Sequence, residues 1–266
     1  MNKEDIAPRA LTIAGSDSGG GAGIEADLKT FTVFNVYGMA AVTSVTAQNT
    51  QTVTAIHNLP PEIVSKQIDA VTEDIGVNAV KTGMLSNEKI IHIVADKIAE
   101  YGFKTVVDPV MVTKRGDPLI EEDAVEVYIE RMVPKALVIT PNITEAHIIT
   151  GEDINDLDDM KNAAKKIYDF GAESVIIKGG TTDDKIFDLF YDGDGFTQLE
   201  GEKYESNKHG TGCTYSSAIA ANLAKGISVL NSVKISKQYI NEAIREGYKL
   251  GKGEHPVNHL VWLGRY

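Results

Sequence analysis

Short apolar runs of strand type alternate with longer amphipathic helical patterns along almost the whole chain. The strand-type runs end in glycine, proline or a polar residue, as buried strands do, and they are residues 10–14, 39–46, 79–83, 105–109, 136–141 and 174–180. Apolar residues recur at helical spacing in residues 23–34, 61–74, 87–100, 120–132, 157–170, 212–225 and 229–249. Strands separated by helices of this length predict βαβ units, and therefore an α/β fold with a central, mostly parallel β-sheet and helices on both faces.

One segment departs from this alternation. Residues 186–199 read as two strands joined by the turn sequence DGDG, which is typical of a β-hairpin. No internal repeat, low-complexity tract or linker divides the sequence. We therefore predict one domain over residues 1–266, with a small flap or hairpin and a flexible N-terminal segment at residues 1–8.

Composition disfavours several classes of partner. The formal net charge is -12, which disfavours nucleic acid and anionic membranes because both require a basic face. Cys213 is the single cysteine, so no internal disulfide and no multi-cysteine metal site can form. No apolar run approaches the roughly 20 residues of a membrane span. We expect a soluble, cytoplasmic protein without a nucleic-acid or membrane partner.

The first glycine-rich loop, residues 15–23 (GSDSGGGAG), lies between a predicted strand and a predicted helix. Residues 21–26 meet the G-x-G-x-x-A spacing of a dinucleotide site, but the acid expected about 20 residues later is missing. No Lys-Ser/Thr pair follows the glycines, so the loop is not a Walker A sequence either. The remaining interpretations are close backbone approach to a ligand, a hinge, or a simple flexible connector.

The second glycine-rich loop, residues 209–214 (HGTGCT), runs directly into a helical pattern. Its glycines allow a sharp turn, and the helix that follows presents unpaired amides and the positive end of its dipole. Such a helix start can hold an anion, for example a phosphate in transfer. We expect a lowered pKa for Cys213 at this position. The alternative is a small-residue turn with a structural, buried cysteine.

Both loops belong to a longer series of motifs. In order along the chain, these are GSDSGGGAGIEADLKTF, KTGML, DPVMV, TPNITEA, IIKGG and HGTGCTYSSAIAANLAKG. Between about residue 10 and about residue 260, this series resembles the hydroxymethylpyrimidine kinase and pyridoxal kinase branch of the ribokinase-like superfamily. The resemblance implies a ribokinase-like fold, an ATP-dependent small-molecule kinase, and a homodimer. It also makes the first loop a substrate-side loop.

The resemblance implies a role for each matched position near the phosphates. Gly210, Thr211, Gly212 and the amide of Cys213 correspond to the anion hole around the γ-phosphoryl group. Cys213 stands where most ribokinase-like sugar kinases carry an aspartate as the catalytic base. The implied ATP- and Mg²⁺-binding residues are Asp108, Asn142, Glu145, Lys178 and Thr211. Asp108 and Glu145 are the implied metal contacts, partly through water.

On the substrate side, Gln48 occupies the position at which thiamine-pathway members read the edge of an aminopyrimidine. An ordinary polar residue at a strand end is the alternative. The other implied substrate contacts are Gly15, Ala22, Asp27, Met84, Val110 and Cys213. Asp27 could instead be a solvated acid on a helix face.

The segment after the DPVMV motif favours one substrate over another. Members of the family that also accept pyridoxal tend to have a cysteine where this chain has Thr113. Lys114 and Arg115 follow on the same flap and could meet a substrate phosphate. The predicted activity is therefore phosphorylation of hydroxymethylpyrimidine to its monophosphate and then to the diphosphate, in thiamine biosynthesis. The alternatives are a pyridoxal kinase and a non-catalytic protein that binds a vitamin precursor.

Overall fold

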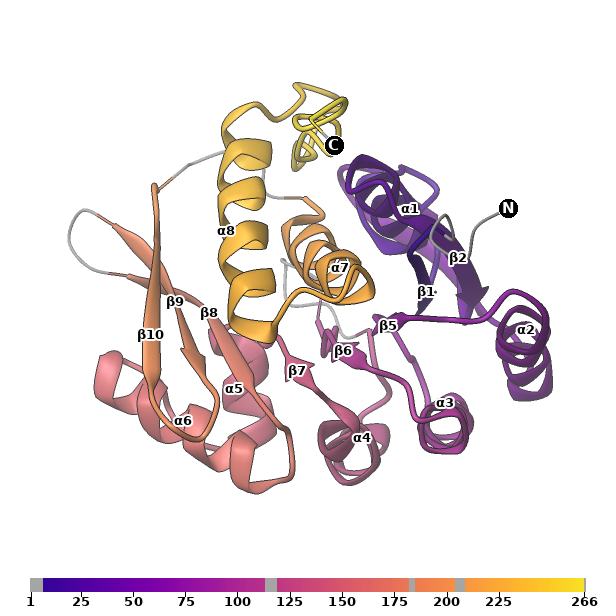
Figure 1. The fold of residues 1–266 in the computed structure, drawn as a ribbon, viewed down its shortest axis with the longest axis horizontal. Coiled ribbons are helices and arrows are strands. Elements are labelled where there is room, and N and C mark those ends of the chain that lie inside the picture. Colours follow the sequence, from indigo (N-terminus) through magenta and orange to yellow (C-terminus); the bar gives the residue numbers. More distant parts are fainter. Residues whose placement is uncertain (1–6, 113–118, 182–184, 204–208, 266) are drawn as a thin grey trace.

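The computed structural model describes residues 7–112, 119–181, 185–203 and 209–265. Its centre is an eight-stranded sheet with the strand order β10-β9-β8-β7-β6-β5-β1-β2 (Figure 1). All neighbouring strands are parallel except β9, which is antiparallel to β8 and β10. The predicted mostly parallel sheet and the predicted hairpin at residues 186–199 are both confirmed.

The strands are β1 Arg9–Ala14, β2 Tyr37–Val42, β3 Ser44–Gln48, β4 Val53–Asn58, β5 Ala79–Thr82, β6 Thr105–Val107, β7 Val138–Ile139, β8 Val175–Thr181, β9 Ile186–Tyr191 and β10 Phe196–Gly201. The helices are α1 Gly23–Val33, α2 Pro61–Asp74, α3 Glu88–Tyr101, α4 Ala124–Met132, α5 Ile143–Thr150, α6 Leu157–Asp169, α7 Thr211–Ala224 and α8 Val229–Arg245. A short 3₁₀ helix, Val133–Lys135, follows α4. Within these ranges, no helix is long and apolar enough to cross a bilayer.

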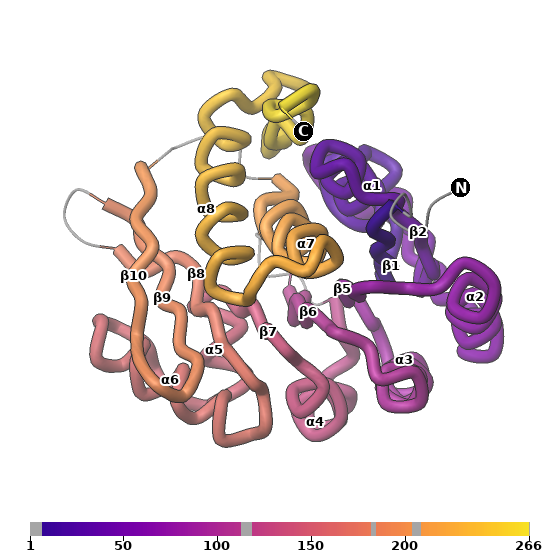
Figure 2. The backbone as a smooth tube through the Cα atoms, viewed as in Figure 1, coloured from indigo at the N-terminus to yellow at the C-terminus, as the bar shows by residue number. Residues whose placement is uncertain are grey.

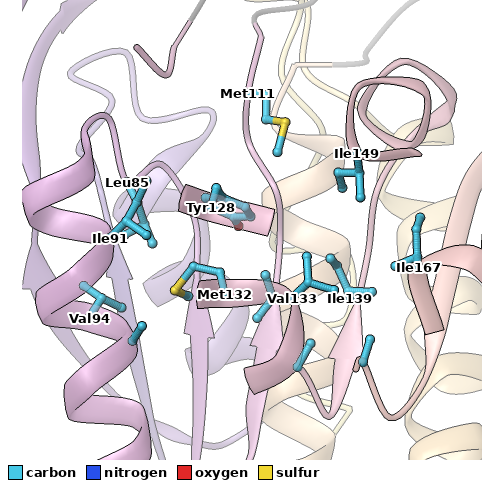
Figure 3. Close-up of a cluster of buried hydrophobic side chains, with 14 of the residues drawn as sticks. Leu85, Ile91, Val94, Met111, Tyr128, Met132, Val133, Ile139, Ile149 and Ile167 are labelled. Carbon is cyan, nitrogen blue, oxygen red and sulfur yellow. The ribbon is translucent and has the colours of Figure 1, made fainter. Parts of the chain in front are cut away.

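Helices cover both faces of the sheet. Successive strand residues point to opposite sides, and because the residues on both sides are apolar, each face packs against helices. Ala10 packs in one cluster with α1, α7 and α8, whereas its neighbour Leu11 packs in a second cluster with α2, α3, α4 and α6. Figure 3 shows part of the second cluster, with Tyr128 and Met132 of α4 beside Val94 of α3. The two cores hold the carboxyl ends of the strands at one edge of the sheet.

Helix α7 lies in the middle of its layer, and every residue from Thr214 to Ala224 is buried. A helix that is buried all round has a fixed direction, because no side of it can move into solvent. Figure 2 shows the C-terminal segment beyond α8 returning to lie near α1, and Trp262 of this segment contacts Phe34 at a ring distance of 5.9 Å.

The predicted strand at residues 39–46 is wrong, because the structure divides it into two strands. β2 ends at Val42 beside β1, which itself ends at Ala14. The chain beyond has no parallel partner left, so β3 pairs antiparallel with β4 in a separate two-stranded sheet. β4 and the short helix α5 were not predicted.

Candidate active site

A cavity of about 230 Å³ opens at the carboxyl ends of the central strands, where ligands bind in sheets of this kind. Nearly all the predicted site residues line it: Gly15, Ala22, Gln48, Met84, Asp108, Val110, Asn142, Glu145, Lys178, Gly210, Thr211, Gly212 and Cys213. Residues that are separated by almost 200 positions in the chain thus share one space. The predicted substrate residues and the predicted phosphate residues meet in a single site.

Asp27 is the exception among the predicted residues. Its side chain is fully buried and does not line the cavity. The carboxylate forms an ion pair with Lys81 at 2.9 Å and accepts hydrogen bonds from the hydroxyls of Thr12 and Ser217, each at 2.6 Å. The predicted substrate contact and the alternative of a solvated acid are therefore both wrong for Asp27. Its partner Lys81 lines the cavity. The sequence placed Lys81 at the end of a strand, where ligands bind, but no role was predicted for it.

The second glycine-rich loop forms the start of α7. Gly210 caps this helix with φ 79°, in the left-handed region that favours glycine. A Cβ at Gly210 would lie 1.7 Å from the carbonyl oxygen of Gly21, so only glycine fits between the two loops. Thr211, Gly212 and Cys213, the first residues of α7, line the cavity, so the unpaired amides and the positive dipole end of this helix make a potential anion site there.

Cys213 lies in the first turn of α7 and is half-buried. The predicted lowering of its pKa is wrong, because burial raises the pKa of the thiol to about 11. The charge of Lys81 acts in the opposite direction but does not outweigh the loss of water. The thiol is therefore protonated at neutral pH in the ligand-free protein.

Asp108 follows β6 and is held by three donors. Its carboxylate accepts hydrogen bonds from Thr140 at 3.1 Å, from Ser216 at 3.1 Å and from Lys178 at 3.2 Å. Burial alone would raise the pKa of Asp108, but the charges of Lys178 and Lys81 and these hydrogen bonds hold it below its ordinary value. Asp108 is therefore an anion that is fixed in place beside the start of α7.

Asn142 and Glu145 form a capping box at the first turn of α5. The spacing that matches the family motif is thus also a requirement of the helix. Burial raises the pKa of Glu145 to about 7, and the nearby charge of Asp108 acts in the same direction, against the charge of Lys178. The two carboxylates repel each other in one cavity, and a divalent cation would relieve this repulsion.

The residues present therefore fit Mg²⁺, which proteins usually bind through one or two carboxylates together with water and substrate phosphates. Asp108 and Glu145 both line the cavity and supply oxygen ligands. Nowhere in residues 7–112, 119–181, 185–203 and 209–265 do three His, Cys, Asp or Glu side chains gather into a metal site. A cation here would depend on ligands from a bound nucleotide.

The first glycine-rich loop is organised by Asp17, which follows the first strand and for which no specific role was predicted. The buried carboxylate accepts hydrogen bonds from the amides of Gly19 at 2.8 Å, Gly21 at 3.1 Å and Ala22 at 2.9 Å. A loop whose amides converge on its own carboxylate is an ordered structure, so the alternative of a flexible connector is wrong for this segment. The signal in the sequence was an aspartate two residues before a run of three glycines.

Gln48 ends β3 and is fixed by the first loop. Its backbone amide donates to the Ser18 hydroxyl at 2.8 Å, and this hydroxyl donates to the Gln48 carbonyl at 2.7 Å. The side-chain oxygen of Gln48 accepts from Thr46 at 3.3 Å. The amide group is therefore held at the cavity wall.

Two further segments border the site. The C-terminal tail contacts the turn after Gln48, because the amides of Gly253 and Glu254 donate to Thr50 at 3.2 and 2.8 Å. Glu254 lines the cavity and was not predicted to do so. The predicted flap residues Thr113, Lys114 and Arg115 lie outside the described residues.

Comparison with known proteins gives one consistent family. A family model described as phosphomethylpyrimidine kinase matches residues 17–258. The chain is 47% identical to the hydroxymethylpyrimidine/phosphomethylpyrimidine kinase of Bacillus subtilis (strain 168), over 96% of this chain and 95% of that protein. It is 49% identical to the Rhizobium meliloti (strain 1021) protein of the same name, over 94% and 96%.

Solved structures agree on the ribokinase-like fold. An ADP complex of Bacillus subtilis pyridoxal kinase superposes with a TM-score of 0.90 at 40% identity, and the match covers 96% of this chain and 98% of that one. The phosphomethylpyrimidine kinase of Clostridium difficile 630 superposes with a TM-score of 0.80 at 45% identity, over 89% and 99%.

Proposed function

The chain belongs to the phosphomethylpyrimidine kinase family, and on this premise we propose that it phosphorylates hydroxymethylpyrimidine and then its monophosphate, with ATP as the donor, in thiamine biosynthesis. The observation that carries this proposal is the single cavity, which joins the wall around Gln48 and Met84 to the anion site at Gly210–Cys213. A kinase needs an acceptor site and a phosphate site in one enclosed space. A protein that only binds a vitamin precursor has no need of the second.

The acceptor side of the cavity suits a small polar heteroaromatic ring. Gln48 carries both a donor and an acceptor on its amide, which can pair with the ring nitrogen and the amino group of an aminopyrimidine. Met84 and Val110 supply apolar lining for the ring faces. Gly15 and Ala22 bring backbone close to the ring, because a glycine or alanine leaves this side of the cavity open.

The donor side neutralises the charge of the transferring phosphoryl group. The amides at the start of α7 and the ammonium group of Lys178 face the cavity that Thr211 and Gly212 also line. Phosphoryl transfer depends mostly on positioning and charge stabilisation, so fixed donors of this kind account for most of the expected rate acceleration.

Asp108 and Glu145 would hold Mg²⁺ together with the phosphates of ATP. When bound, the cation neutralises phosphate charge during the transfer. Asn142 fixes the Glu145 side chain through the capping box. Asn142 therefore orients a metal ligand and does not bind the metal itself.

Cys213 is the proposed proton acceptor for the substrate hydroxyl, at its Sγ atom. Because its thiol is protonated at neutral pH in the free protein, only the thiolate, formed by release of the thiol proton to water before the substrate fills the cavity, acts as the base. The demand on the base is small, since a loose transition state gives the attacking oxygen little bonding until late in the reaction. The side chain also lies at the cavity wall, where it can hold the hydroxyl in line with the phosphate.

A pyridoxal kinase is the second candidate, and the closer superposition on the Bacillus subtilis pyridoxal kinase than on the Clostridium difficile enzyme favours it. Against it stands Thr113, where pyridoxal-accepting members tend to have a cysteine. A homodimer and a cytoplasmic location belong to the main proposal. Among the described residues, Tyr37 on β2 and Val45 on β3 are exposed apolar side chains that a second copy could cover.

The proposal is tested by identifying the products. Purified protein is incubated with Mg²⁺, ATP and hydroxymethylpyrimidine, and phosphorus NMR and mass spectrometry follow the reaction. We expect a monophosphate ester first and a diphosphate afterwards. Formation of pyridoxal phosphate in a parallel reaction, with no pyrimidine product, would establish the second candidate instead. Consumption of ATP in neither reaction would favour the non-catalytic alternative.

A further inference from the structure

The two glycine-rich loops of the site are joined by one side-chain contact. The Nε2 atom of His209 lies 2.8 Å from the Oδ2 atom of Asp17, although the two residues are 192 positions apart in the chain. Asp17 belongs to the loop before α1, and His209 precedes the glycine that caps α7. The Asp17 side chain is buried, with 2% of its surface exposed, and the His209 side chain is mostly buried, with 17% exposed.

The Asp17 carboxylate acts as an acceptor for both loops. Its Oδ2 atom accepts from the amides of Gly21 and Ala22 and from His209. Burial would raise the pKa of Asp17, but the hydrogen bond and the charge of His209, together with the loop amides, hold it below its ordinary value. An ionised carboxylate can only accept hydrogen bonds, so the Nε2 atom of His209 carries a proton and donates a hydrogen bond to Asp17.

His209 is also fixed from its other side. Its backbone amide donates to the His255 carbonyl at 3.1 Å, and the Val257 amide donates to the His209 carbonyl at 3.2 Å. The ring packs closely against the first loop, since a Cβ on Gly21 would lie 2.2 Å from the His209 Cδ2 atom. A histidine held by backbone on one side and by a carboxylate on the other leaves the loops little freedom to separate.

These contacts lie between the two halves of the reaction centre. Ala22 donates its amide to Asp17, and it lines the substrate side of the cavity. Gly210 directly follows His209 and begins the anion site. A change in the length of the Asp17–His209 contact would therefore change the distance between the substrate and the phosphoryl group.

We infer that Asp17 and His209 form a positioning pair, which holds the substrate-side loop at a fixed distance from the anion site. This inference rests on the proposed function. His209 acts through the loops and not on the reacting atoms. A displacement of about 1 Å between reacting groups can cost about 10²-fold in rate. The proposed nucleotide contacts, Asp108 and Lys178, lie elsewhere, directly after β6 and on β8. Loss of the pair should lower kcat and leave the KM for ATP unchanged.

Two opposite substitutions of His209 test this inference in the full-length protein. His209→Phe retains a flat ring and removes the donor, whereas His209→Gln removes the ring and retains an N–H that can reach the carboxylate. We expect His209→Phe to lower kcat with hydroxymethylpyrimidine about 10²-fold, with the KM for ATP within about twofold of wild type. We expect His209→Gln to recover most of this loss, which a purely structural role of the ring would not produce.

His255→Ala is the matched control, because His255 lies in the tail that contacts His209 and its ring forms a hydrogen bond to the Leu250 carbonyl at 2.9 Å, away from Asp17. It should leave kcat unchanged. Thermal unfolding of each variant is measured first, and if His209→Phe does not fold, the smaller His209→Ala replaces it. Wild-type turnover is the baseline: its absence contradicts the proposed function. With an active wild type, native kcat in the donor-free variant, or a His209→Gln variant no better than it, would overturn the inference.

Discussion

Asn142 and Glu145 exchange hydrogen bonds across the first turn of α5. The Asn142 side chain accepts from the Glu145 amide at 2.9 Å, and the Glu145 carboxylate accepts from the Asn142 amide at 2.8 Å. One oxygen of Glu145 thus serves the helix, while the charge of the group faces the cavity. Structure and proposed metal binding depend on the same side chain, and a substitution can separate them.

Glu145→Gln keeps the cap and removes the charge. A glutamine oxygen can still accept from the Asn142 amide, so we expect the free energy of unfolding at pH 8 to be equal to or greater than that of wild type. The Mg²⁺ concentration needed for half-maximal turnover should rise about 10–100-fold. Urea unfolding and a Mg²⁺ titration of activity measure the two effects. An unchanged Mg²⁺ dependence would show that Glu145 has no part in metal binding.

Cys213→Ala should lower turnover by about 10²–10⁴-fold, the usual contribution of general-base catalysis, while ATP still binds. Near-native turnover of this variant would refute the assignment of the base. The same residue allows a direct check of its raised pKa, because it is the only cysteine in the chain. In the ligand-free protein, the rate of alkylation by iodoacetamide should keep rising through pH 9. A plateau below pH 9 would contradict the pKa of about 11.

Lys81→Met should destabilise the protein strongly. It leaves the buried carboxylate of Asp27 without its ion-pair partner, and breaking such a pair costs about 3–5 kcal/mol. The double variant Lys81→Met with Asp27→Leu should recover more than half of this loss, because no unpaired charge remains. Lys161→Met, which breaks an exposed pair with Asp158, is the control and should cost less than about 1 kcal/mol. Equal costs for the two single variants, in urea unfolding, would contradict the prediction.

His259 should make the protein less stable in acid. Burial lowers its pKa to about 4, with a smaller contribution from the charge of Lys29, so the folded protein holds the ring neutral. Between pH 6.5 and 4 the unfolded chain binds a proton that the folded protein does not, so stability falls as the pH falls through this window. By linkage, the loss from pH 7 to pH 5 is about 2 kcal/mol.

His259→Gln removes the titrating group and can still donate to the Gly21 carbonyl, which the histidine contacts at 3.2 Å. Urea unfolding at pH 7 and pH 5 compares the two proteins. The variant should lose less stability than wild type over this interval. The same loss in both would mean that His259 titrates normally.

Periodicity was sufficient to predict the main sheet, because its strands are buried on both faces and read as continuous apolar runs. It failed at residues 39–46, where nothing in the local sequence shows that β1 ends at Ala14 and leaves the next residues without a partner. The short helix α5 was not predicted, because its eight residues form little more than two helical turns and show too little periodicity to be recognised.

Within the site, the residues that follow the central strands could be predicted, since parallel strands bring their carboxyl ends to one edge. The burial of individual side chains could not. The sequence around Asp27 is that of a surface acid, and its burial depends on the distant ion-pair partner Lys81. The pKa of the Cys213 thiol depends on its burial, which the local sequence does not show. The contact between Asp17 and His209 joins distant loops and has no local signature.

The proposed function requires this cavity to select an aminopyrimidine and to phosphorylate it. The most direct measurement is kcat/KM for hydroxymethylpyrimidine, its monophosphate and pyridoxal, in wild type and in Gln48→Met. We expect wild type to prefer the two pyrimidines. The variant should lose about tenfold with both, the usual effect of one lost hydrogen bond, at an unchanged KM for ATP. A wild-type preference for pyridoxal, or a Gln48→Met variant that is equally active on the pyrimidines, would contradict the claim.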